Sequence, residues 1–94
     1  MARHELLDGV EMNRRHPAAA RIPSAFEKAQ IQPGDYVKVG FIIDQCHQEF
    51  LWVKVVAVNG KSISAILDDD PVYADVRFAE KIEIEPRHVL RIER

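Results

Sequence analysis

The spacing of hydrophobic residues along the chain changes at Asp35. Before this residue the apolar positions are irregular and interrupted by prolines and by Gly9. From Tyr36 onward they alternate with polar residues, which is the two-residue period of a β-strand. The clearest example is the segment 36–43, where one face is apolar and is expected to point inward: it consists of Val37, Val39, Phe41 and Ile43. The pattern predicts helices before residue 35 and strands after it.

Five short strands follow from the alternation, over residues 36–43, 50–58, 61–67, 81–85 and 89–92. Asn59-Gly60 separates the second strand from the third and favours a two-residue type I′ turn, with positive φ at both residues. Such a turn would place Trp52 opposite Leu67. Pro86-Arg87-His88 interrupts the last two strands and predicts a single 3₁₀ turn.

The first third of the chain carries weaker helical signals. Ser24 and Glu27 have the spacing of a capping box, which predicts a short helix over Ala25–Gln30. Pro33-Gly34 would end it in a tight turn, because proline presets φ and glycine accepts positive φ. A loose helix is expected over Glu5–Asn13.

These elements predict a mainly β (α+β) fold. Five short strands joined by turns favour a small antiparallel curled sheet, or a five-stranded barrel of the Tudor or Src-homology-3 type, because closure removes exposed strand edges. A short N-terminal helix would cover one end. We interpret residues 1–21 as a partly helical N-terminal extension and residues 22–94 as a single small barrel domain.

Four segments occur in a fixed order along this domain: Ile22-Pro23-Ser24, then Pro33-Gly34-Asp35-Tyr36-Val37-Lys38-Val39, then Phe50-Leu51-Trp52-Val53-Lys54-Val55, then Leu67-Asp68-Asp69-Asp70-Pro71-Val72. In order and spacing they resemble a family of small bacterial proteins of unknown function. The resemblance covers roughly residues 22–92 and implies no assigned activity. Related families are suspected of being toxin-immunity proteins, so the resemblance suggests an immunity-type role.

Charge and cysteine content narrow the possible partners and the expected location of the protein. The chain has 13 Lys and Arg against 15 Asp and Glu, a formal net charge of −2, which argues against a strong polyanion binder. The single cysteine, Cys46, cannot form an internal disulfide, and the first residues lack the apolar segment of a secretory signal. We therefore expect a cytoplasmic protein. No apolar run is long enough for a membrane span.

The sequence predicts no catalytic, metal or cofactor site. Cys46 and His47 are adjacent, and neighbouring residues in a loop seldom align for proton transfer. The histidines and the cysteine lack the spacing of zinc ligands. The acidic cluster Asp68-Asp69-Asp70 would need a turn to converge on a cation, so it is interpreted as a solvated turn.

A binding site is predicted instead around Trp52 and Lys54 on one strand face, with Asp69, Asp70 and Tyr73 from the acidic loop. The alternative is that Trp52 fills the core, because so small a barrel needs its largest side chains inside. An aromatic anchor beside carboxylates suits a basic or amine-bearing peptide. The sequence favours a non-enzymatic protein- or peptide-binding module, including the immunity type that the resemblance implies. A nucleic-acid-associated small barrel is the alternative and a small hydrolase the third. Self-association through a strand edge or the Trp52 face, giving a homodimer, is a further expectation.

Overall fold

A computed structural model describes residues 5–16, 22–43 and 47–93 of the 94-residue chain. Its strands are β1 (Glu5–Leu6), β2 (Tyr36–Ile42), β3 (Gln48–Asn59), β4 (Ser62–Leu67), β5 (Lys81–Ile84) and β6 (Arg91–Glu93). Its helices are α1 (Gly9–Arg15), α2 (Ala25–Lys28) and the 3₁₀ helix η1 (Pro86–His88). Each of the five predicted strands is present, and η1 confirms the predicted 3₁₀ turn.

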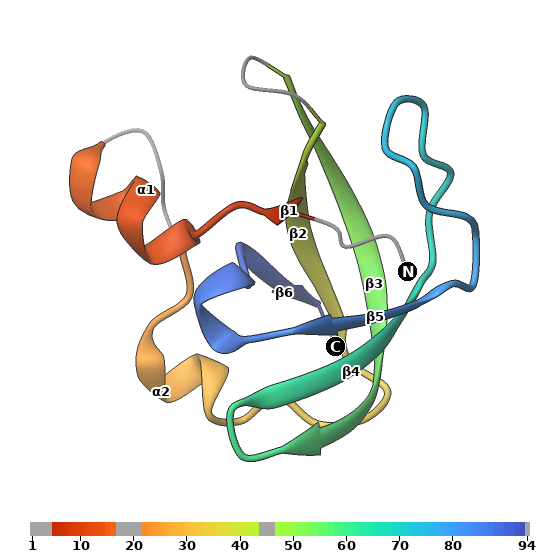
Figure 1. Cartoon of the computed structure of the whole chain (residues 1–94). Helices are drawn as coiled ribbons and strands as arrows, with labels where there is room; N and C mark the ends of the chain where they lie inside the picture. Colours follow the sequence, from red (N-terminus) through yellow and green to blue (C-terminus); the bar gives the residue numbers. More distant parts are fainter. Residues whose placement is uncertain (1–4, 17–21, 44–46, 94) are drawn as a thin grey trace.

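The described strands form one antiparallel sheet that curls into a half-barrel (Figure 1). Neighbouring strands follow the order β1-β2-β3-β4-β5, and β6 returns to pair with β2. The free edge of β2 is therefore shared: β6 pairs with its first half and β1 with its last two residues. The predicted mainly β fold with a small antiparallel curled sheet is confirmed.

Alternation along the strands places one face of each in the core. The inward side chains of β2 to β5 are nearly or fully buried: Val37, Val39, Phe41, Leu51, Val53, Val55, Ile63, Ala65, Leu67, Ile82 and Ile84. The period of two thus predicts burial correctly along most of the sheet. The prediction is wrong for Ile43, which is 36% exposed because β2 ends one residue earlier.

The turn between β3 and β4 lies one residue later than predicted. Asn59 pairs with Ser62, so the two central residues are Gly60 and Lys61. Among them only Gly60 has a positive φ, 59°, which is the pattern of a type II′ turn with glycine first. The prediction of a type I′ turn at Asn59-Gly60 is therefore wrong. A β-bulge between Val55 and Ala57 then moves the pairing of β3 with β4 back by one residue.

As a consequence, Trp52 does not lie opposite Leu67, which pairs with Val53. The next residue, Asp68, faces Trp52, and its backbone N–H donates to the Trp52 carbonyl at 3.0 Å. This one-residue correction brings the acidic segment directly beside Trp52.

Both predicted helices are present, with bounds that differ from those expected. Ser24 and Glu27 form the expected capping box, although α2 ends at Lys28. The helix expected over Glu5–Asn13 begins only at Gly9, because the Asp8 side chain accepts from the Glu11 N–H and caps it there. The two residues of β1 instead pair with β2.

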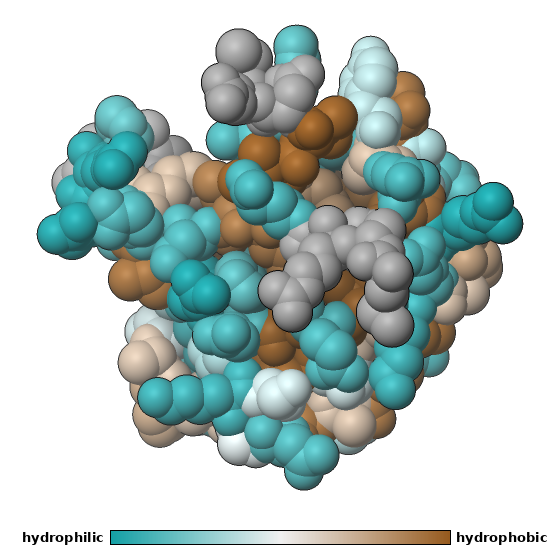
Figure 2. All heavy atoms as spheres, viewed as in Figure 1, coloured by the Kyte–Doolittle hydropathy of each residue, from teal (hydrophilic) through white to brown (hydrophobic). Residues whose placement is uncertain are grey.

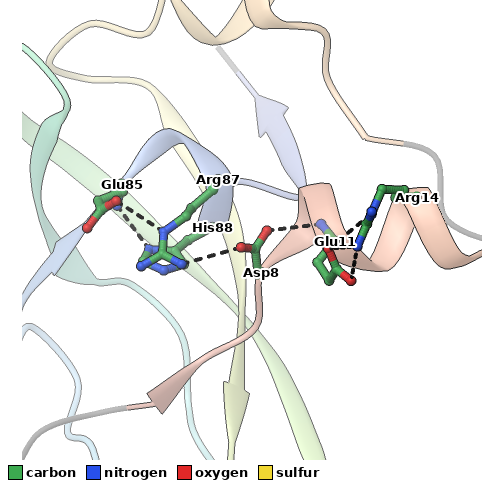
Figure 3. A network of polar contacts seen from close by, with 6 residues as sticks. All are labelled: Asp8, Glu11, Arg14, Glu85, Arg87 and His88. Atoms are coloured by element: carbon green, nitrogen blue, oxygen red, sulfur yellow. Dashed lines mark hydrogen bonds and ion pairs between the residues drawn. The ribbon is translucent and has the colours of Figure 1, made fainter.

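The backbone at Gly9, where α1 begins, packs closely against the Leu90 side chain at the end of the barrel. A Cβ at Gly9 would lie 2.6 Å from Leu90 Cδ2. Figure 3 shows the polar contacts between the start of α1 and η1. Asp8 Oδ2 accepts a hydrogen bond from Arg87 at 3.3 Å, and Arg87 also donates to Glu85 at 3.1 Å. The segment from β1 to α1 is thus joined to the barrel by pairing, packing and charge.

The Pro33-Gly34-Asp35 motif forms the expected turn before β2. Gly34 has φ 99°, and its N–H donates to the Val55 carbonyl at 2.8 Å. Asp35 is buried and its carboxylate accepts from the Gln32 N–H at 3.1 Å. The motif therefore has a structural role in starting the sheet. No helix among the described residues is long and apolar enough to cross a membrane.

Candidate functional site

The outward faces of five strands, β2 to β6, form the candidate site, which we call the outer patch. Its side chains alternate with the buried ones and therefore lie on the solvent side of the sheet. The outer patch consists of Tyr36, Lys38, Trp52, Lys54, Ile66, Lys81 and Arg91. Trp52 and Tyr36 are half-buried, so both rings belong to the surface rather than to the core.

Two lysine–aromatic pairs lie at the centre of the outer patch. Lys38 is directly opposite Trp52 in the β2–β3 register, and Lys38 Nζ lies 5.3 Å from the Trp52 ring centroid. Tyr36 is opposite Lys54, and Lys54 Nζ lies 5.9 Å from the Tyr36 ring centroid. Both distances are within the range of cation–π attraction, which contributes about 0.5–1 kcal/mol at exposed sites. The aromatic residues are thus partnered by the chain's own cations.

The outer patch is positively charged although the whole chain is not. Lys38 is paired with Arg91 of β6 on one side, while a row across β3, β4 and β5 runs from Lys54 through Ile66 to Lys81. Four cations therefore span the patch. Three acids border it: Glu93 lies opposite Tyr36, Asp68 lies opposite Trp52, and Glu83 follows Lys81 on the outward face of β5. The local balance favours an anionic partner.

The carboxylate of Asp69 has a structural role beside the outer patch. Its Oδ2 accepts from the Trp52 N–H at 3.1 Å, and its Oδ1 accepts from the Asp70 N–H at 2.9 Å. Both oxygens are therefore engaged by backbone donors of this chain. Asp70 itself is exposed. The interpretation of the acidic cluster as a turn agrees with these contacts, and the described residues contain no group of His, Cys, Asp or Glu that could hold a metal ion.

Tyr73 lies away from Trp52. The N–H groups of Val72, Tyr73 and Ala74 all donate to the Glu49 carboxylate, at 2.6, 2.9 and 2.7 Å. Glu49 is three residues before Trp52 in β3, so the two side chains leave opposite faces of the strand. The structure therefore separates Tyr73, 74% exposed, from the other predicted site residues.

Glu49 was not predicted from the sequence, although an acidic residue in the inward phase of a strand is an unusual position that marks it. Burial raises the pKa of Glu49, but the three backbone donors lower it more, and the pKa is lowered overall. Its carboxylate thus fixes the start of the long loop between β4 and β5 in its charged form.

Of the predicted site, the structure brings Trp52 and Lys54 together on one face and ties Asp69 to the Trp52 backbone. Because Lys38 and Lys54 already lie over the two rings, a cationic peptide would compete with them. The geometry therefore favours a partner of the opposite charge to the one expected from the sequence. Of the Cys46-His47 pair, Cys46 lies outside the described residues and His47 is exposed.

Comparisons with protein-family models, with curated proteins and with solved structures found no match to this chain.

Proposed function

We propose that this protein is a non-enzymatic binding module that holds an acidic segment of a protein partner on the outer patch. The observation that carries the proposal is the pairing of Lys38 with Trp52 and of Lys54 with Tyr36 across β2 and β3. Each pair offers an apolar ring surface next to an ammonium group. An acidic segment with interspersed apolar residues matches both.

Two further features support a binding role. Tryptophan, tyrosine and arginine are the residue types that most often dominate binding energy at protein interfaces, and the outer patch contains one of each. They project from paired strands rather than from loops, so little conformational freedom would be lost on binding. The cations would increase the rate of encounter with an acidic partner.

The immunity-type role implied by the family resemblance is one form of this proposal, in which the acidic partner is a toxin. A toxin gene next to the gene for this protein would support that form. A toxin whose activity is unaffected by this protein would contradict it.

The proposal is tested with a defined probe, a twelve-residue peptide of alternating Glu and Leu, titrated into ¹⁵N-labelled protein. We expect chemical-shift changes on β2, β3 and β6, including the Trp52 indole N–H. Lys38→Ala and Lys54→Ala should each weaken binding about two- to fivefold, the range of exposed charge pairs. The matched control is Lys61→Ala, because Lys61 is an exposed lysine in the β3–β4 turn. Equal losses in all three variants would contradict the proposal.

A single-stranded nucleic acid is a second candidate, favoured by the same combination of four cations with Trp52 and Tyr36. Oligo-dT of twelve residues is the probe, and its affinity would fall steeply with salt if phosphates are neutralised. Binding of oligo-dT in preference to the Glu-Leu peptide at 150 mM salt would replace the first proposal by the second.

A further inference from the structure

A cavity of about 650 Å³ lies on a different side of the molecule from the outer patch. It is bounded by α1, α2, the β3–β4 hairpin and η1, the elements on the left and lower left of Figure 1. Its volume falls within the range of small-molecule sites, about 300–1,000 Å³. Most of the wall is apolar, with side chains from four parts of the chain: Val10, Ile22, Pro23, Val58, Ile63 and Pro86. Figure 2 shows apolar surface below α1 on this side.

Two cationic side chains line the same cavity, and they differ in their surroundings. Arg87 is neutralised by ion pairs with Asp8 and Glu85, at 3.3 and 3.1 Å (Figure 3). The ammonium group of Lys28, on α2, makes no hydrogen bond or ion pair with any residue in the part of the chain that the structure describes. It is also half-buried. A partly desolvated ammonium without a counterion is costly, and an anionic ligand group would compensate it.

The electrostatic environment of Lys28 also favours an anionic ligand group beside its ammonium. Burial lowers the pKa of Lys28, and attraction to Asp8 only partly offsets the effect. A carboxylate placed beside the ammonium would favour its charged form and reverse the shift. The apolar walls would at the same time remove a hydrocarbon or aryl group from water.

We propose that this cavity binds a small amphiphilic carboxylate, with its apolar body between α1, α2 and the β3–β4 hairpin and its carboxylate on Lys28. The inference does not depend on the outer patch, and it adds a ligand site to a binding module. No covalent chemistry is involved.

The test uses 2-naphthoate as the probe and 2-naphthalenemethanol as its uncharged match, each titrated into ¹⁵N-labelled full-length protein. A ligand of this size that gains about 0.3 kcal/mol per heavy atom would bind with a Kd of about 1 mM. We expect 2-naphthoate to reach this affinity, with shift changes on α1, α2 and the β3–β4 hairpin. The uncharged match should bind at least about fivefold more weakly.

Three variants make the test specific. Lys28→Met keeps the length of the side chain but removes its charge. It should weaken the binding of 2-naphthoate at least about fivefold and leave the affinity for 2-naphthalenemethanol unchanged. Arg77→Met removes an exposed cation that lies outside both the cavity and the outer patch, and this control should bind like the original chain. Ala29→Leu narrows the cavity and should weaken both probes. Unchanged 2-naphthoate affinity in Lys28→Met, or shift changes confined to the outer patch or missing altogether, would overturn the proposal.

Discussion

Lys38 Nζ lies 5.3 Å from the centroid of the Trp52 ring, directly across the β2–β3 pair. The relationship explains how a tryptophan remains on the outer face of a small sheet. One side of the indole is covered by the aliphatic and cationic parts of a neighbouring lysine. The ring is therefore half-buried without contributing to the core.

The position of Trp52 predicts a modest cost on its removal. Trp52→Ala should destabilise the fold by about 1–2 kcal/mol, because only part of the ring is removed from water. The matched substitution is Leu51→Ala, one residue away and 3% exposed, which should cost about 2–5 kcal/mol. Urea denaturation measures both. A larger loss for Trp52→Ala than for Leu51→Ala would show that the indole supports the core.

The β3–β4 turn predicts different responses at adjacent positions. Gly60→Val should cost about 1–2 kcal/mol, because a β-branched residue is strained at a positive φ. Lys61→Val, at the second central position, should be nearly neutral. Chemical denaturation of both variants gives the comparison, and equal effects would contradict the type II′ assignment.

The Glu49 carboxylate should make the stability of the loop between β4 and β5 depend on pH. Its pKa is lowered in the folded protein, so its stabilising contribution is present above the ordinary value of 4.5 and is lost as the pH falls through the lowered pKa. Amide exchange at Val72, Tyr73 and Ala74, corrected for intrinsic rates, should therefore accelerate at acidic pH. Glu49→Gln should accelerate it already at pH 7. The matched control is Glu83→Gln, whose carboxylate accepts from the hydroxyl of Ser64 rather than from the loop. Unchanged exchange in Glu49→Gln would argue against this anchor.

His88 should make the free energy of unfolding depend on pH as well, in a higher pH range than Glu49. Burial, and secondarily the charge of Arg87, lower the pKa of His88 below 6.5, and its Nδ1 accepts from the Glu85 N–H at 3.0 Å. The stabilisation is complete above 6.5 and is lost as the pH falls through the lowered value, where protonation removes the acceptor. The free energy of unfolding should thus fall between pH 7 and pH 5, and His88→Ala should flatten this dependence. An equally steep dependence in the variant would assign the effect to other groups.

Local patterns in the sequence predicted most of the sheet. Alternation from Tyr36 onward identified the inward faces, and the spacing of Ser24 and Glu27 identified the start of α2. Both features depend on neighbouring residues alone. By contrast, Asn59 continues β3 because it pairs with Ser62, and this displaced the predicted turn by one residue.

The candidate site was predictable only in part, because it depends on contacts between distant segments. The spacing of Trp52 and Lys54 correctly placed them on one face of a strand, but it did not decide whether Trp52 lies in the core or on the surface. Lys38 and Arg91 join them only through the register of β2 with β3 and β6, which no local pattern encodes. Tyr73 was grouped with them by its closeness in sequence to Asp70, whereas Glu49 holds its backbone elsewhere.

In the proposed function the positive charge of the outer patch selects an acidic partner, so reversal of that charge should reverse the preference. The measurement is the affinity of the Glu-Leu peptide and of a matched Lys-Leu peptide for the original chain and for the double variant Lys38→Glu/Lys54→Glu. We expect the original chain to prefer the Glu-Leu peptide and the double variant, still folded, to prefer the Lys-Leu peptide. The same preference in both proteins would contradict the proposed function.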